Sequence, residues 1–153
     1  MFLTTTRYLQ MIDYIDTIVP MKHISVIRNG HKTITKQDGS ESHENYDTTI
    51  DGKNGSSIKI KSVTDVKDND DEAVDYKFVR ITGNLAMFIQ GQNVYGTNDL
   101  LALCNKAFPI IAEKLGIKPT KKNLRQWQSG DFVVNTLDVT YNFDLQSQAN
   151  VNK

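Results

Sequence analysis

The pattern of apolar and polar residues predicts an α+β domain, with a mainly antiparallel sheet of about five strands and one principal helix packed on a face. Two observations carry this prediction. Residues 133–145 and several shorter segments alternate apolar and polar side chains with the period of a strand. Residues 97–115 instead repeat apolar side chains at helical spacing. The 153 residues suit a single domain with an ordinary hydrophobic core.

The first half of the chain is expected to supply strands and hairpins. Residues 11–19 form a β-rich run with apolar residues on both faces, which predicts a central strand ended by Pro20. Residues 29–57 contain four Asn-Gly or Asp-Gly pairs, so we expect hairpins with exposed tips there. Residues 58–63 alternate as a half-buried strand, and the acidic run 65–75 is expected to be a solvated loop.

Further strands are expected before a glycine-rich turn. Residues 76–81 alternate again, and the short apolar run 85–89 predicts another strand that ends near Gly91. Gly91 and Gly96 bracket four residues, and glycine tolerates the positive φ that a sharp change of direction requires. A strand should therefore end at this turn and a helix should begin after it.

The principal helix is predicted over residues 97–115. Thr97, Asn98 and Asp99 each carry a side-chain oxygen that can accept from a first-turn amide. Gly116 suits the position just after a helix, and Pro109 predicts a kink or break inside it. A basic linker is expected to follow, before the alternating strand that begins at Val133.

Composition limits the classes of function. Lysine plus arginine number 18 and aspartate plus glutamate number 18, so any nucleic-acid contact must come from a local basic patch. The single cysteine, Cys104, excludes an internal disulfide, and its apolar surroundings predict a buried thiol in a reducing cytoplasm. No run approaches the roughly 20 apolar residues of a membrane helix, so we expect no membrane partner.

The segment FIQGQNVYGTNDLL, residues 88–101, resembles the N-terminal region of the replication initiators encoded by gene II of filamentous phages and of their phage and plasmid relatives. NTLDVTY, residues 135–141, is similar to a later strand of that family that carries an aspartate. MIDYI, residues 11–15, looks like the family's start. The resemblance covers residues 11–145, so 1–10 are expected to be a disordered extension and 146–153 a disordered tail.

The resemblance implies a rolling-circle initiator with a ferredoxin-like or RRM-like sheet, acting in the cytoplasm of a bacterial host. Family members look like site-specific DNA nickases, in which a tyrosine attacks a DNA phosphate beside a divalent metal, Mg²⁺ or Mn²⁺. The chain departs from the pattern at Gln92, where a histidine is expected, and at Thr136, where an arginine is usual. It is also less than half as long, so the resemblance implies a domain or fragment.

Asp138 is the candidate catalytic residue, because it matches the strand aspartate of the family and its carboxylate could complete a metal site. The histidine pair and the framed tyrosine of the family are absent, so no metal ligand set is assigned within the chain. The alternative is that Asp138 faces water on the polar side of its strand, between Thr136 and Thr140.

DNA contacts are predicted at two places. The first is the most basic segment, where cations and an aromatic residue could meet phosphates and bases, although a solvated linker explains the charges equally well. The second is the glycine turn, where a structural role is the alternative. The candidate DNA-binding residues are Lys118, Lys121, Lys122, Arg125, Trp127, Asn93 and Tyr95.

The predicted function is therefore the N-terminal part of a phage or plasmid initiator that binds origin DNA, single- or double-stranded, and contributes part of a nicking site. Its partners would include a C-terminal half or a full-length initiator. The main alternative is a short, non-catalytic homologue that binds DNA or the full-length initiator and regulates replication. A third interpretation, a domain without a nucleic-acid role, rests on the neutral charge.

Overall fold

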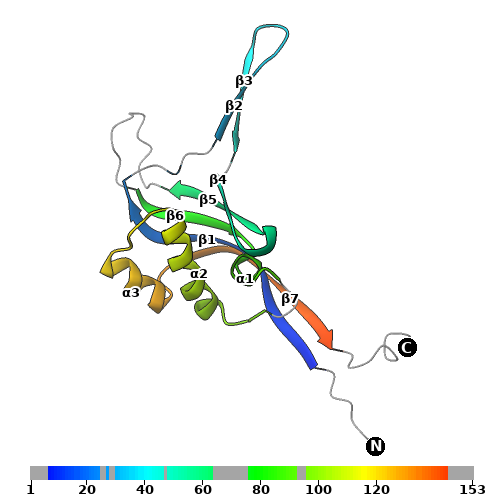
Figure 1. The fold of residues 1–153 in the computed structure, drawn as a ribbon, viewed down its shortest axis with the longest axis vertical. Helices are drawn as coiled ribbons and strands as arrows, with labels where there is room; N and C mark the ends of the chain where they lie inside the picture. The colour runs from blue at the N-terminus through cyan, green and yellow to red at the C-terminus, as the bar shows by residue number, and fades with distance from the viewer. Residues whose placement is uncertain are drawn as a thin grey trace, which may run out of the picture.

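The computed structural model describes residues 7–24, 27, 30–46, 48–63, 76–92 and 96–144. These residues form a five-stranded antiparallel sheet in the order β4-β5-β6-β1-β7, with helices on one face, and a separate hairpin that projects from the body of the molecule (Figure 1). The predicted fold class is confirmed. The elements are β1 (Arg7–His23), β2 (Gly30–Thr35), β3 (Glu41–Tyr46), β4 (Thr48–Asp51), the 3-10 turn η1 (Lys53–Gly55), β5 (Ser57–Val63), β6 (Tyr76–Gly83), α1 (Leu85–Gln90), α2 (Leu100–Lys114), α3 (Lys121–Ser129) and β7 (Val133–Asp144).

The central strand, β1, pairs with β6 on one side and with β7 on the other. This confirms the central position predicted for residues 11–19, although the strand runs past Pro20 as far as His23. It also begins earlier than expected. Arg7 pairs with Asp144, so residues 7–10 belong to the sheet and the prediction of a disordered extension is wrong for them. Residues 1–6 and the expected tail 146–153 lie outside the described residues.

The hydrophobic core lies between the sheet and the helices. Alternation turns every second residue of β1, β5 and β6 toward the helices, and these positions are apolar and buried. The helices supply the other half of the core, with edge-to-face contacts from Phe108 to Trp127 and to Phe132. The fully buried large side chains of the core are Trp127, Phe88, Phe108, Ile15, Met21, Ile58, Ile60, Ile81, Leu85, Ile111, Val19 and Val79.

The apolar run 85–89 forms the helix α1, so the strand predicted there is wrong. The side chain of Asn84 accepts a hydrogen bond from the amide of Met87 at 2.7 Å, which caps the helix. Gly91 ends it in the left-handed conformation, with φ of 76°. Such a short apolar run has no period that separates a strand from a helix, and the cap and the glycine decide the outcome.

The principal helix, α2, has the predicted cap and end. The Asp99 carboxylate accepts from the Ala102 amide at 2.9 Å. At the other end the amides of Gly116 and Ile117 donate to carbonyls of the last turn, at 3.0 and 2.8 Å, as in a Schellman motif. The helix runs through Pro109 without the predicted break. Pro109 is exposed, and packing on the buried side outweighs the lost hydrogen bond.

The expected basic linker is instead the helix α3, which is a second correction. The Thr120 hydroxyl accepts from the Asn123 amide at 3.1 Å, and the Asn123 side chain accepts from the Thr120 amide at 3.3 Å. This reciprocal pair is a capping box with asparagine in the place of the usual glutamate or glutamine. Trp127 then anchors the helix in the core.

The hairpins predicted over residues 29–57 are confirmed by β2–β3 and β4–β5. Asp38 and Gly39 form the tip of the first, where the Gly39 amide donates to the Lys36 carbonyl at 2.9 Å. Residues 58–63 and 76–81 fall in β5 and β6, as predicted. The acidic run 65–75 lies outside the described residues.

The contact between α1 and the turn after β4 predicts a steric effect at Gly52. A Cβ added there would lie 2.6 Å from both the carbonyl oxygen and a ring carbon of Phe88, and neither can move far because Phe88 is buried. We expect Gly52→Ala to lower the free energy of unfolding by about 2–3 kcal/mol, measured by urea denaturation.

Gly116→Ala is the matched control, because a Cβ there meets nothing within 4 Å although φ is 68°. It should lose only the left-handed strain, about 1 kcal/mol. Equal losses in the two variants would contradict the steric argument.

A candidate site on the open face of the sheet

Side chains from four strands share the face of the sheet that is turned away from the helices. In an antiparallel pair, residues directly opposite each other lie on the same face. Asp16 of β1 is opposite Thr82 of β6 and Thr136 of β7, and Thr82 is opposite Lys59 of β5. We call this surface the open face. It consists of Tyr14, Asp16, Lys59, Lys61, Arg80, Thr82, Thr136 and Asp138.

A cavity of about 200 Å³ lies on the open face and is lined by Tyr14, Asp16, Lys59, Lys61 and Arg80, with Ile60 and Thr82. Three of these side chains are cations, one is a carboxylate and one is a phenol. Alternation along β5 exposes both lysines while it buries the isoleucines between them. The same pattern that builds the core therefore concentrates positive charge on the opposite face.

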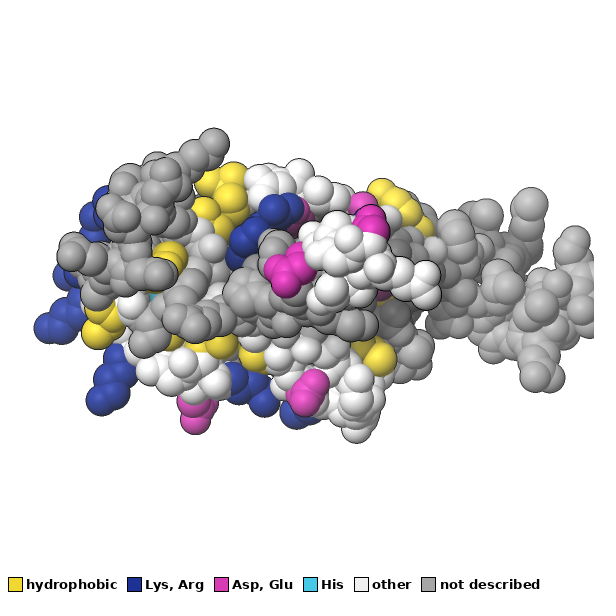
Figure 2. Space-filling view, turned by 90° about the horizontal axis from the view of Figure 1, so that it is seen from above, with side chains coloured by type: hydrophobic (Ala, Val, Ile, Leu, Met, Phe, Trp, Pro, Cys, Tyr) yellow, Lys and Arg dark blue, Asp and Glu magenta, His cyan; other side chains and the backbone are white. Residues whose placement is uncertain are grey.

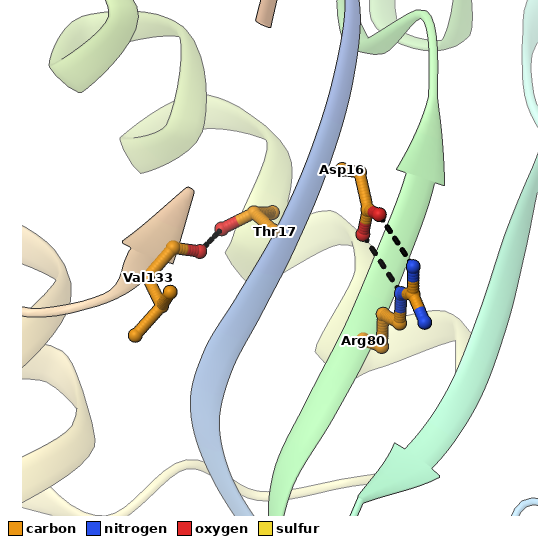
Figure 3. Close-up of polar contacts among 4 residues, drawn as sticks. All are labelled: Asp16, Thr17, Arg80 and Val133. Atoms are coloured by element: carbon orange, nitrogen blue, oxygen red, sulfur yellow. Dashed lines mark hydrogen bonds and ion pairs between the residues drawn. The ribbon is translucent and has the colours of Figure 1, made fainter. Parts of the chain in front are cut away.

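Asp16 and Arg80 form a bidentate ion pair across β1 and β6 (Figure 3). The Arg80 Nε donates to one carboxylate oxygen at 2.8 Å and Nη2 donates to the other at 2.5 Å. The Asp16 side chain is 9% exposed and that of Arg80 is 47% exposed. The hydrogen bonds from Arg80 hold the pKa of Asp16 below its ordinary value, and a bond from Asn135 acts in the same direction against the effect of burial.

A bulge in β7 brings Asn135 to this pair. Asp16 pairs with Thr136 and Thr17 pairs with Val134, so Asn135 is the extra residue between them. The Thr17 hydroxyl donates to the Val133 carbonyl at 2.6 Å and fixes the two strands at the bulge (Figure 3). Sequence patterns did not indicate this arrangement, because its members come from three separate strands.

Asp138 is exposed on β7 and pairs with Tyr14, which places it on the open face with Asp16. The resemblance thus pointed to a residue on the same surface as the cavity. Its catalytic role stays a prediction, as does the alternative that it only faces water.

The described residues do not build a metal site. Among them, no three histidine, cysteine or acidic side chains come together in a way that could hold an ion. The rings of His23 and Tyr76 stack, and the two ring nitrogens of His23 lie 2.7 Å from the Met21 carbonyl and 2.8 Å from the Ser62 hydroxyl. Asp16 is engaged by Arg80. Asp138 could supply one ligand, and the others would have to come from elsewhere.

The predicted DNA-binding residues separate into three groups. Lys118, Lys121, Lys122 and Arg125 are exposed on α3 or just before it. Trp127 is only 2% exposed and its indole N–H donates to the Pro20 carbonyl at 2.7 Å, so it belongs to the core, which contradicts its predicted stacking role. Two more candidates, Asn93 and Tyr95, lie outside the described residues.

The fold and the open face define an α+β domain with helices on one side of the sheet and cations on the other, the kind of sheet with which RRM domains bind RNA. The family described as the N-terminal region of the replication-associated protein, the gene II type, matches residues 11–153, and the chain belongs to that family. The resemblance to gene II initiators is thereby confirmed.

One relative is the replication-associated protein of Enterobacteria phage I2-2, which is 27% identical over 142 residues. The match covers 92% of this chain and 40% of the relative, so the chain spans less than half the length of that protein. No solved structure matches. Within the described residues, no helix is both long enough and apolar enough to cross a membrane.

The Asp16–Arg80 pair predicts a stability that depends on pH. The pKa of Asp16 is lower in the folded than in the unfolded chain, so the pair stabilises the fold above the unfolded pKa of about 3.9 and loses this effect as the pH falls through the folded pKa. We expect Asp16→Asn to cost about 1 kcal/mol at pH 7, a value reduced by the exposure of Arg80. The difference from the unmodified chain should vanish in acid, as measured by urea denaturation at several pH values.

Asp51→Asn serves as the control, because that carboxylate is exposed at the end of β4. A loss in Asp16→Asn that stayed constant down to a pH of about 2, well below the unfolded pKa, would refute the assignment.

Proposed function

We propose that the chain binds origin DNA as the N-terminal domain of a phage or plasmid rolling-circle replication initiator and contributes part of a nicking site. The observation that carries this proposal is the cationic cavity on the open face, in a chain of the gene II initiator family. DNA binding by a protein with no net charge requires such a local concentration of cations.

The charges of the cavity favour phosphate. Lys59 and Lys61 are exposed, and the one carboxylate among the lining residues, Asp16, is neutralised by Arg80. The ion pair also holds the guanidinium of Arg80 in a fixed orientation. An arginine held in this way loses little side-chain entropy when it meets a phosphate, because its planar fork is already in place. Tyr14 adds a partly exposed ring against which a base could stack.

The contribution to nicking would come from Asp138. Its carboxylate lies on the same face as the proposed DNA path, where it could ligate Mg²⁺ or Mn²⁺ beside a phosphate. The remaining ligands and the attacking tyrosine would belong to the part of the initiator that follows this domain. The chain by itself is therefore proposed to bind DNA and not to cut it.

The proposal predicts that the lysines of β5 control DNA affinity. We expect the double variant Lys59→Gln, Lys61→Gln to bind a fluorescent oligonucleotide more weakly, and the slope of log K against log salt to fall by about two, one for each lost phosphate contact. Fluorescence anisotropy at several salt concentrations measures both quantities.

The matched control is Lys106→Gln, Lys114→Gln, which removes the same charge from exposed positions of α2. If the two double variants weaken binding equally, DNA contact through the open face is excluded.

A second candidate function is regulation through contact with a full-length initiator, and the exposed edge of β7 favours it. Among the described strands, β7 pairs with β1 alone, and it is twelve residues long, whereas the other edge strand, β4, has four. Leu137 and Val139 remain 39% and 36% exposed. A long edge strand with apolar side chains is a template for another strand.

The two candidates differ in an assay in which the replication-associated protein of phage I2-2 is tested for nicking of its own origin DNA in the presence of Mg²⁺. A regulator should lower the nicking rate, and Leu137→Lys should relieve the inhibition because it places a charge on the edge. Lys106→Gln again serves as the control. A nicking rate unchanged by the unmodified chain would remove the regulatory candidate and leave the DNA-binding one.

A further inference from the structure

A second cavity lies where β1, β6 and α3 meet, at one end of the sheet. Its volume is about 270 Å³, and its lining includes Lys22, Lys77, Phe78, Thr120 and Lys122. Lysine and arginine side chains gather at the end of the molecule that lies at the left of Figure 2, where α3 and the paired ends of β1 and β6 lie in Figure 1. We call this space the end cavity.

The charge of the end cavity calls for an anion. Lys22, Lys77 and Lys122 come from three different elements, and none of the described residues that line the cavity is acidic. Like charges around one small space repel each other, and a bound anion converts this repulsion into attraction. The volume lies just below the range of drug-sized ligand sites, which suits a phosphate group or a single nucleotide unit.

Asn123 supplies an independent sign of a ligand. Its side chain lines the cavity and the residue is 6% exposed. The side-chain oxygen accepts from the backbone amides of Lys22 and Thr120, both at 3.3 Å. Because both partners are N–H donors, the accepting atom must be the oxygen, and the other atom is the NH₂ group. Within the part of the chain that the structure describes, no hydrogen bond is made by that NH₂ group.

A buried donor without an acceptor is costly, and native structures retain few of them. In the end cavity, the NH₂ group of Asn123 lies beside the first turn of α3, whose backbone N–H groups and dipole also favour negative charge. The Thr120 hydroxyl is already used by the Asn123 amide, so it does not compete for the ligand. Three lysines, an amide donor and a helix start thus share one ligand preference.

We propose that the end cavity binds a phosphate group of a DNA strand. This inference rests on the proposed function and extends it, because Phe78 and Arg80 stand on the same face of β6, two residues or about 7 Å apart. Phe78 lines the end cavity and Arg80 lines the cavity of the open face. One strand of DNA could therefore occupy both, with a base against the ring of Phe78.

Asn123→Asp tests the proposal with little change of shape. An aspartate oxygen can accept from the Lys22 and Thr120 amides as the asparagine oxygen does, but the NH₂ donor is replaced by a negative charge. Gln128→Glu is the matched control, because it makes the same change of charge at an exposed position of α3. Amide NMR spectra of both variants report whether the fold is retained.

The probe is thymidine monophosphate, with thymidine as its uncharged counterpart, titrated while the amide shifts of Lys121 and Lys122 are followed. We expect the monophosphate to shift these amides in the unmodified chain and in Gln128→Glu, and thymidine to leave them unchanged. Asn123→Asp should bind the monophosphate at least about tenfold more weakly, since a hydrogen bond to a charged group is lost and repulsion is added.

Equal affinities of the two variants for the monophosphate, or equal shifts with thymidine, would overturn the proposal. The outcome is separable from that of the DNA-binding function. If Asn123→Asp alone loses the monophosphate while the β5 lysine variant keeps its DNA affinity, the end cavity stands and DNA binding through the open face fails. If the lysine variant loses DNA but Asn123→Asp matches its control, the reverse holds.

Discussion

The register of β1 is the constraint on which the rest of the structure depends. The strand pairs on both sides, and its alternation sends Ile15 and Val19 into the core while Tyr14 and Asp16 go to the open face. A slip by one residue would exchange the two faces, burying a carboxylate and exposing the core. The Thr17 hydroxyl bond to β7 therefore holds more than one pair of strands, because it fixes which residues become surface.

The ion pair between Asp16 and Arg80 couples this register to the chemistry of the surface. Asp16 is the more buried partner and needs its carboxylate satisfied, and Arg80 and Asn135 do so from the strands on either side. The same contacts align the guanidinium with the lysines of β5. A requirement of folding and a feature suited to phosphate recognition are met by one interaction, which explains how a chain with no net charge presents a cationic face.

Sequence patterns predicted the parts of the fold that local periodicity determines. The alternation of β7 and the caps at Asp99 and Gly116 are local signals, and each led to the observed element. α1 was mistaken for a strand because a short apolar run carries no period. α3 was mistaken for a linker because its surface is polar, and its one signal was the capping box formed by Thr120 and Asn123. Asp138 was reached through the family pattern, whereas Asp16 and Arg80 lie 64 positions apart and only the sheet pairing brings them together.

The pairing of β1 with β7 has a consequence for synthesis of the protein. Arg7 pairs with Asp144, so the first described strand acquires its neighbour only when the last one has left the ribosome. Until then the long central strand has one open side, and the bond from Thr17 has no partner. Contacts between residues so far apart slow folding and leave a nascent chain prone to pairing with other strands. The architecture that places Asp16 and Asp138 on one face thus makes the domain dependent on being translated through residue 144 before its sheet can be completed.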